Sequence, residues 1–338
     1  MNKPFKGKHG PLLIAEIGGN HEGNFEYAKK LTQQAIDTDV DFVKFQIYTG
    51  DSLVSSLESL DRNKHFKKFE LTPTEHCYLA DMVTEAGIQY TSSVWDIDAM
   101  GWIDNYINLY KIGSGDLTAY PVLKKTAIKG KPIILSTGLS SELEVLDAVK
   151  YIQSVNNAYK SADMLALLQC TSMYPINPQD SHLNVMNELR KKTNLTVGYS
   201  DHTEGNKALL YAVAMGAEVL EFHFTDSRVG KVFRDHKVSL TLDEVKDLIR
   251  EIKLIIDYQG SSQKKPVQIE LDNGHEITFR RAVYPSKDIE EGELLSEENL
   301  TVLRPNHGID ARKYDDLIGK KAKVSLKRHQ KLQWNYFD

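Results

Sequence analysis

The 338-residue sequence has only two cysteines, Cys77 and Cys170. Two cysteines cannot form the framework of several disulfides that stabilises small secreted domains, and nothing pairs them at the spacing of a metal site. No apolar run approaches the ~20 residues of a membrane span, and the run at 12–14 is too short for the core of a signal peptide. We therefore expect a cytoplasmic protein with no membrane partner.

The sequence also lacks an excess of positive charge. Its net charge is −5, whereas a general nucleic-acid binder needs a basic surface to neutralise phosphates. We therefore expect no nucleic-acid partner, although a local basic pocket for a small phosphorylated ligand is compatible with this charge. Hydrophobic residues make up 41% and charged residues 26% of the chain, which is typical of a globular protein.

Short β-branched or aromatic runs alternate eight times with longer amphipathic stretches. The candidate strands are 12–18, 41–48, 88–94, 109–114, 132–138, 165–172, 196–201 and 219–225. An S/T-x-x-E capping pattern marks helix starts at 72–75, 141–144 and 241–244. Such alternation builds a parallel sheet, and eight units close naturally into a (β/α)8 TIM barrel. An open doubly wound sheet is the alternative, but no G-x-G-x-x-G follows the first strand.

The pattern changes after the eighth unit. Residues 259–279 are polar and interrupted, which indicates a linker, and short elements follow from Arg280. We therefore predict an α/β chain with a barrel domain at 1–258 and a small domain at 280–338. A domain of about 60 residues has little core of its own and usually depends on a neighbour for stability.

The active site of a (β/α)8 barrel lies at the carboxyl ends of its strands. Side chains alternate along a strand, so Lys44 and Gln46 share one face, and Glu221 and His223 share another. A charged side chain inside a barrel is costly unless it is paired or functional. The polar groups at the strand ends are Glu16, Lys44, Gln46, Lys111, Ser114, Ser136, Ser172, Ser200, Asp201, His202, Glu221 and His223.

These groups have a functional and a structural interpretation. Two lysines among hydroxyls and glycines are typical of a site for a small polyanion, and His202 and His223 could share a divalent metal ion. Alternatively, a lysine at a strand end extends to solvent, and a single strand histidine is more often a hydrogen-bonded core residue. The gathering of so many such groups on one rim favours function.

Segments along the chain resemble, in order, the signatures of the N-acetylneuraminate (sialic acid) synthase family. They are IAEIGGNHEG, VKFQ, YKIGSGD, ILSTG, LLQCTSMYP, GYSDHT, LEFHFT and RDHKVSL. The tail RRAVYPSKDIEEGELLSEENLTVLRP is similar to the antifreeze-like (SAF) domain that closes those enzymes. The resemblance implies a metal-dependent condensation. C3 of phosphoenolpyruvate attacks the aldehyde carbon of an open-chain N-acylated mannosamine-type sugar, and water displaces phosphate at C2, giving a nonulosonic (sialic) acid.

The resemblance also implies a role for each matching residue. Phosphoenolpyruvate would be held by Lys44, Lys111, Ser114, Ser136 and Ser200. A divalent ion, Mn²⁺ with Mg²⁺ or Co²⁺ as alternatives, would be bound by His202 and His223. Glu16 would handle a proton, and the residues that would contact the sugar or water on the metal are Gln46, Asp116, Tyr174 and Asp235. Ser172 would also bind substrate, and the expected assembly is a homodimer in which the tail of one chain caps the other barrel, with Arg304 at the partner's sugar site.

Several departures from the family pattern lie near the expected sugar end of the site. Asp116 stands where Glu is usual, Ser172 where Asn is common and Phe222 where Arg is common. The loop at 228–234 reads RVGKVFR where the family usually has a glycine–proline pair. The segment RPNHG at 304–308 differs from the glycine-rich run that usually follows RP in the family. These departures leave open which amino sugar is used, and whether the protein is fully active.

Four other functions therefore stay open. A legionaminic or pseudaminic acid synthase would run the same chemistry on a 2,4-diacetamido sugar. A barrel aldolase would use a lysine as Schiff-base nucleophile, but would leave the two histidines without a role. A catalytically impaired relative would act as a regulator. An ice-binding module would need a flat apolar face, whereas the tail is highly charged.

Overall fold

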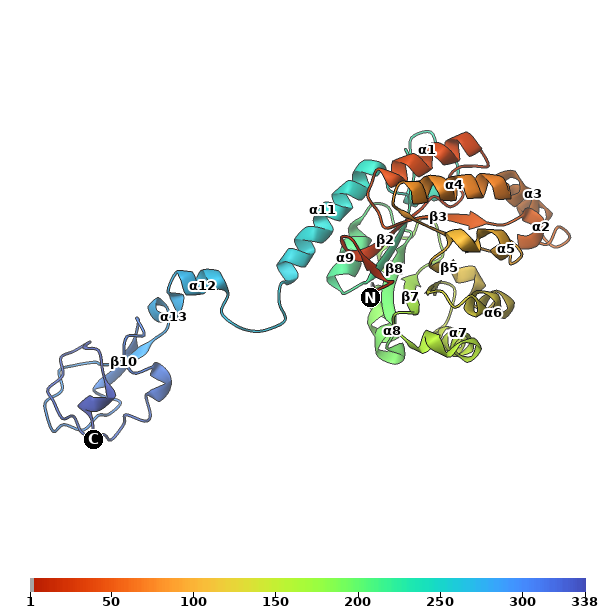
Figure 1. Cartoon of the computed structure of the whole chain (residues 1–338). Helices are drawn as coiled ribbons and strands as arrows, with labels where there is room; N and C mark the ends of the chain where they lie inside the picture. The colour runs from red at the N-terminus through yellow and green to blue at the C-terminus, as the bar shows by residue number, and fades with distance from the viewer. Residues whose placement is uncertain (1–2) are drawn as a thin grey trace. The chain divides into compact units, whose positions relative to one another are not determined.

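The structure is a computed structural model that describes residues 3–338 and divides into two compact units. The first unit extends to Gly260, and the second comprises Ser261–Asp338 (Figure 1).

Eight parallel strands form a closed barrel in the first unit (Figure 1). They are β2 (Gly10–Glu16), β3 (Phe42–Ile47), β4 (Gln89–Val94), β5 (Tyr110–Ile112), β6 (Ile133–Ser136), β7 (Leu165–Cys170), β8 (Thr196–Asp201) and β9 (Val219–His223). Each strand pairs with the next in sequence, and the barrel closes between β2 and β9, where Glu16 lies opposite His223. The predicted TIM barrel is confirmed.

Helices surround the barrel. They are α1 (Phe25–Ile36), α2 (Gly50–Leu53), α3 (Leu60–Phe69), α4 (Pro73–Glu85), α5 (Met100–Ile103), α6 (Tyr120–Ile128), α7 (Glu142–Val155), α8 (Val185–Thr193), α9 (Lys207–Ala214), α10 (Asp235–Val238) and α11 (Leu242–Gln259). Short 3-10 turns are η1 (Asp104–Tyr106), η2 (Ser114–Asp116), η3 (Asn157–Lys160) and η4 (Pro178–Asp180). The three predicted capping boxes are present at the starts of α4, α7 and α11. Each box satisfies backbone N–H groups that the first helical turn leaves free.

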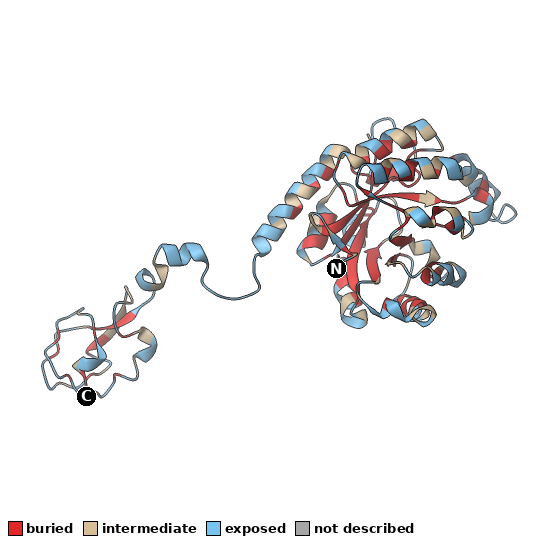
Figure 2. Cartoon of the chain, in the orientation of Figure 1, coloured by how far each residue is buried: buried red, intermediate tan, exposed pale blue. Residues whose placement is uncertain are grey.

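The strands are buried on both faces, as Figure 2 shows. One face packs against the helices through a large apolar cluster that includes Val43, Phe45 and Phe222. The other face fills the barrel interior with a second cluster, which includes Leu12, Ile14 and Phe42. Because side chains alternate along a strand, this parity sends the polar groups at the carboxyl ends into the barrel.

A short hairpin, which the sequence patterns do not predict, lies at the amino ends of the strands. Strand β1 (Lys6–Gly7) pairs antiparallel with the start of β2. Phe5, next to β1, belongs to the interior apolar cluster and is 6% exposed. The apolar end of the barrel is therefore the amino end, and the polar groups occupy the opposite end.

The second unit is small and has its own core. It contains α12 (Gln268–Asp272), α13 (His275–Thr278), η5 (Ala311–Lys313) and η6 (Trp334–Tyr336), with β10 (Ala282–Pro285) antiparallel to β11 (Leu300–Leu303). Its apolar core includes Val283, Leu295 and Leu317. Within residues 3–338, no helix is long and apolar enough to cross a membrane.

Candidate active site

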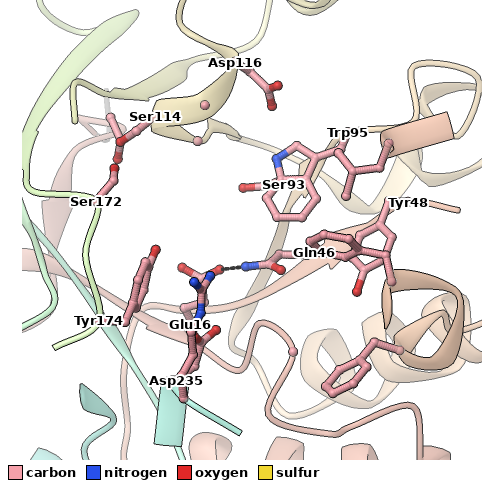
Figure 3. Close-up of a pocket in the computed structure, with 18 of the residues that line it drawn as sticks. Glu16, Gln46, Tyr48, Ser93, Trp95, Ser114, Asp116, Ser172, Tyr174 and Asp235 are labelled. Atoms are coloured by element: carbon pink, nitrogen blue, oxygen red, sulfur yellow. Dashed lines mark hydrogen bonds and ion pairs between the residues drawn. The ribbon is translucent and has the colours of Figure 1, made fainter. Parts of the chain in front are cut away.

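A cavity of about 1060 Å³ opens at the carboxyl ends of the barrel strands (Figure 3). The predicted site residues in its lining are Glu16, Lys44, Gln46, Lys111, Ser114, Asp116, Ser136, Ser172, Tyr174, Ser200, His202 and Asp235. They come from different strands and from the loops that follow them. The barrel thus brings together residues that are far apart in the sequence.

Lys44 lies at the centre of a buried charge network on the floor of the cavity. Its side chain is 2% exposed, and its Nζ lies 2.6 Å from Oε1 of Glu16 and 3.3 Å from Oε1 of Glu221. Burial alone would lower the pKa of Lys44, but the two carboxylates raise it above its ordinary value. Burial would raise the pKa of Glu16, but the ammonium groups of Lys44 and Lys111 bring it well below its ordinary value. These groups therefore remain charged at neutral pH.

Lys111 shares this network through Glu221. The Lys111 Nζ lies 3.1 Å from Oε2 of Glu221 and 3.3 Å from the carbonyl oxygen of Ile112. Ser200 donates a 2.7 Å hydrogen bond to the same Oε2 atom. Burial would raise the pKa of Glu221, but Lys111 and Lys44 lower it. An ammonium group has three N–H donors, so Lys44 and Lys111 each keep one N–H free of these partners.

Two serine hydroxyls beside the lysines are also available to a ligand. Among the described residues, the buried Oγ of Ser136 has no hydrogen-bond partner. The Oγ of Ser114 accepts a 3.0 Å hydrogen bond from the backbone N–H of Gly138, which leaves its own O–H to donate elsewhere. Buried polar groups are rarely left unpaired in a native structure. Free donors beside two ammonium groups therefore indicate a site for an anion.

His202 and His223 lie next to each other at the ends of β8 and β9. Their ring centroids are 5.4 Å apart, and the ring of Tyr174 lies 3.9 Å from that of His202 and 5.6 Å from that of His223. Nδ1 of His202 is 2.7 Å from the carbonyl oxygen of Thr171. Burial would lower the pKa of His202, but Cys170 and the Thr171 carbonyl raise it to about 9. With Nδ1–H held by Thr171, Nε2 is the nitrogen that a metal would use, and the metal would have to displace its proton. Asp201 accepts a hydrogen bond from the backbone N–H of Thr203 and thereby anchors this loop.

The histidine pair fits a divalent ion in part. Nδ1 of His223 is buried without a hydrogen-bond partner among the described residues, and its Nε2 lies 3.9 Å from Oε2 of Glu16. Burial lowers the pKa of His223, which favours the neutral ring that binds metals. Within residues 3–338, no three His, Cys, Asp or Glu side chains form a complete metal site. The protein would therefore supply two imidazoles, and substrate or water would supply the remaining ligands.

Gln46 and Asp235 line the cavity above the lysines. Nε2 of Gln46 donates a 2.6 Å hydrogen bond to Oε1 of Glu16 (Figure 3). Asp235, at the start of α10, lies 3.2 Å from Nε of Arg234, whose guanidinium lies 4.6 Å above the Tyr174 ring. These polar groups line the same cavity as the lysines and serines.

Asp116 stands apart from the charge network. Burial raises its pKa to about 6, and Lys111 is the charge that opposes this shift. No hydrogen bond to its carboxylate contributes to the shift. As far as residues 3–338 show, the carboxylate is thus available as a hydrogen-bond acceptor in the cavity.

Three predicted residues, Asp201, His223 and Arg304, are not among the residues that line the cavity. His223 lies against Tyr174 and His202. Arg304 belongs to the second unit, where its guanidinium lies 5.2 Å from the centroid of the Phe279 ring. Its predicted role at a partner's site stays a prediction.

Some lining residues were missed or given no role by the sequence reasoning. They are Tyr48, Ser93, Trp95, Cys170, Glu221 and Arg234. The sequence places Glu221 among the polar residues at the strand ends, but only the structure shows that its carboxylate contacts both Lys44 and Lys111. For Ser93 and Trp95 a signal existed, because they end or follow the strand predicted at 88–94.

The fold and the cavity define a (β/α)8-barrel protein whose polar site is built for a small anion. Residues 31–264 match the NeuB family, and residues 280–337 match the SAF domain. The chain belongs to the NeuB family and carries a C-terminal SAF domain.

Named relatives cover nearly the whole chain. It is 35% identical to the N,N'-diacetyllegionaminic acid synthase of Campylobacter jejuni, over 95% of this chain and 98% of that protein. It is 29% identical to the human N-acetylneuraminate-9-phosphate synthase, over 98% and 94% of the two chains. The structure of the N-acetylneuraminic acid synthetase of Leptospira borgpetersenii superposes with a TM-score of 0.71 at 29% identity, over 78% of this chain and 90% of that chain.

Proposed function

We propose that the protein condenses phosphoenolpyruvate with the aldehyde carbon of an open-chain N-acyl amino sugar, giving a nonulosonic (sialic) acid and phosphate. The observation that carries this proposal is the pair of buried lysines, Lys44 and Lys111, in the same cavity as Ser136, whose hydroxyl has no hydrogen-bond partner among the described residues. Phosphoenolpyruvate has two anionic groups, and charge-assisted hydrogen bonds from ammonium groups bind such groups strongly. The names of the relatives agree with this product class.

In the proposed reaction, the chain's residues hold the two substrates and move a proton. The lysines with Ser114 and Ser136 orient phosphoenolpyruvate so that its C3 faces the aldehyde carbon. Glu16 is a carboxylate at neutral pH, and we propose that it accepts a proton from the water that attacks C2 once the anionic groups of phosphoenolpyruvate offset the lysine charges that hold its pKa low. Loss of phosphate from C2 then leaves the keto acid. Gln46, Asp235 and Tyr174, with Ser172, would contact the sugar.

The two histidines would hold a divalent ion, with Mn²⁺ proposed and Mg²⁺ or Co²⁺ as alternatives. Bound there, the ion would act as a Lewis acid toward the aldehyde oxygen. Support comes from Nδ1 of His223, which has no hydrogen-bond partner within residues 3–338, and from the Thr171 contact, which leaves Nε2 of His202 as the nitrogen available to a metal. This arrangement gives the histidines a role, which the Schiff-base aldolase does not.

The proposal is tested by incubating the full chain with phosphoenolpyruvate, MnCl2 and a panel of 2-acetamido and 2,4-diacetamido sugars. We expect phosphate release that requires both a sugar and the metal. Borohydride added with pyruvate should trap no imine on a lysine. Phosphoenolpyruvate binding without phosphate release from any sugar would instead identify a catalytically impaired relative, and a trapped imine would identify an aldolase.

We further propose a homodimer in which the tail of each chain caps the partner's barrel, with Arg304 contacting the sugar there. The second unit has a small core of its own, which suits a domain that depends on a neighbour. A guanidinium can hydrogen-bond sugar hydroxyls or an acyl carbonyl with fixed geometry. At a two-fold interface such an exchange is reciprocal.

Mixing two inactive variants tests this exchange. An Arg304→Ala chain and a His202→Ala chain should recover activity together, because a mixed dimer contains one barrel with intact histidines capped by an intact arginine. Random pairing limits the recovery to about a quarter of wild-type activity per total chain. Subunit exchange is followed by native mass spectrometry. If the subunits exchange and no activity returns, Arg304 acts in the barrel of its own chain or has no role in catalysis.

A further inference from the structure

Glu22 lines the active-site cavity from the loop between β2 and α1. Its backbone φ is +52°, in the left-handed region. A residue other than glycine adopts this region only at a cost in free energy, and residues held in this way gather at functional sites. The loop therefore carries a glutamate at a position where glycine would be less strained.

Neighbouring groups fix the backbone of this loop. The N–H of Glu22 donates a 2.9 Å hydrogen bond to the carbonyl oxygen of Gly19. The next residue, Gly23, lies so close to the end of α3 that a methyl group on it would collide with the carbonyl oxygen of Lys68. The left-handed conformation of Glu22 is thus imposed by its surroundings, which keep the side chain directed from one fixed point.

A second set of contacts joins the loop to α10, the helix that begins at Asp235. The side-chain amide of Asn20 is buried, and it donates to the carbonyl oxygen of Phe224 at 2.9 Å and to Oγ of Ser239 at 2.8 Å. Ser239 in turn donates a 2.7 Å hydrogen bond to the carbonyl oxygen of Asp235. The loop that carries Glu22 is therefore linked to the backbone of a residue that we propose contacts the sugar.

The carboxylate of Glu22 has a buried partner, His236 of α10. The imidazole is 1% exposed, with Nε2 at 3.2 Å from Oε1 of Glu22 and Nδ1 at 2.7 Å from Oγ1 of Thr225. Burial lowers the pKa of His236, against a smaller opposing effect of Glu22, so the ring is neutral at pH 7. A carboxylate only accepts hydrogen bonds, so the ring proton lies on Nε2, and Nδ1 accepts the hydroxyl proton of Thr225. This chain of contacts orients the carboxylate.

His236 occupies one side of the carboxylate and leaves acceptor positions toward the cavity. The Glu22 side chain is 40% exposed, and a carboxylate has about four acceptor positions on its two oxygens. The charge of Glu22 would repel the anionic groups of phosphoenolpyruvate, whereas hydroxyl groups can donate to it. We propose that Glu22 binds hydroxyl groups of the acceptor sugar and that His236 is the positioning residue that orients it. This inference rests on the proposed function, which supplies the sugar.

Glu22→Gly is the sharpest test, because glycine adopts a φ of +52° without strain. Water from the cavity can replace the carboxylate at His236, so the variant should unfold at the wild-type temperature or above it. Loss of a hydrogen bond to a charged group should lower kcat/KM for the sugar about 10- to 150-fold. The KM for phosphoenolpyruvate should not change. Glu26→Gln is the matched control, since Glu26 is 80% exposed and pairs with Lys29 on α1.

Deoxy sugars give a readout that a role in folding alone would not change. The experiment uses the sugar that gives phosphate release in the panel above, together with analogues that each lack one hydroxyl beyond C3. In the wild type, loss of the hydroxyl that Glu22 contacts should lower kcat/KM by the same factor of about 10 to 150. In Glu22→Gly that hydroxyl has no carboxylate to donate to, so its loss should have little effect.

The role of His236 is tested by keeping or removing the N–H donor beside Glu22. His236→Gln keeps a side-chain N–H and should retain most of the wild-type kcat/KM for the sugar. His236→Leu has no donor and should approach the value of Glu22→Gly. The double variant His236→Leu/Glu22→Gly should be no worse than Glu22→Gly alone, because both changes remove the same contact.

The possible failures are distinct. No phosphate release from any sugar with the wild type would reject the proposed function itself. Release by the wild type with an unchanged kcat/KM for the sugar in Glu22→Gly would reject only the role of Glu22. Equal effects of every deoxy analogue in the wild type and Glu22→Gly would also reject it, by showing that no hydroxyl contacts the carboxylate. If Glu22→Gly is less stable than the wild type, Glu22→Gln takes its place in the deoxy series and is judged by the same comparison.

Discussion

Replacing either His202 or His223 with alanine should remove the stimulation of phosphate release by divalent metal. The two rings are the only imidazoles assigned to the ion, and within residues 3–338 no larger group of metal-binding side chains is present to replace them. Lewis-acid polarisation of an aldehyde contributes several kcal/mol, so kcat/KM should fall at least about 100-fold. Equilibrium dialysis with Mn²⁺ should show the loss of binding directly, without reference to activity.

His76 offers a matched control. It is a buried histidine on α4, 2% exposed, whose Nδ1 has no hydrogen-bond partner among the described residues. It packs against Phe45 and Trp102, on the helix side of the barrel wall. His76→Leu should therefore keep metal binding. Full metal-dependent activity in both His202→Ala and His223→Ala would exclude the metal assignment.

Local sequence patterns were sufficient for the barrel and for the direction of its polar side chains. Strand alternation put Lys44 and Gln46 on one face, and in the structure Lys44 lies in the barrel, on the same face as Phe42 of the interior cluster. The rule that barrel sites lie at carboxyl strand ends then selected residues that line one cavity. Both inferences need only the two-residue period of a strand, which a single sequence shows, and the general rule for where a barrel places its site.

Partnerships between distant residues were beyond those patterns. Glu221 and Lys111 are 110 positions apart, yet their side chains meet at 3.1 Å. The raised pKa of Asp116 depends on burial by other elements, and residue type alone cannot reveal it. The same holds for the stacking of Tyr48 on Trp95, because each ring follows a different strand. The resemblance to a family assigned roles to Lys44 and Lys111, but it did not show the carboxylate between them.

Lys44→Met should impair both folding stability and phosphoenolpyruvate binding. Lys44 is 2% exposed between Glu16 and Glu221, and its removal leaves Glu16 without its closest cation. Breaking a buried ion pair from one side costs about 3–5 kcal/mol of unfolding free energy. Loss of a charge-assisted contact should raise the KM for phosphoenolpyruvate by roughly 10- to 150-fold. Urea denaturation and initial rates of phosphate release measure the two effects.

A second substitution separates stability from binding. In Lys44→Met/Glu16→Gln the unpaired carboxylate next to residue 44 is neutral, so much of the lost unfolding free energy should return. The ammonium group is still missing, so phosphoenolpyruvate affinity, followed by its protection against thermal unfolding, should stay low. If Lys44 only stabilised the fold, the double variant should recover both its unfolding free energy and its affinity for phosphoenolpyruvate. Recovery of the unfolding free energy alone therefore assigns Lys44 to phosphoenolpyruvate binding. A Lys44→Met protein with an unchanged KM for phosphoenolpyruvate and a raised KM for the sugar would reverse the assignment, placing the ammonium group at the acceptor instead of the anion.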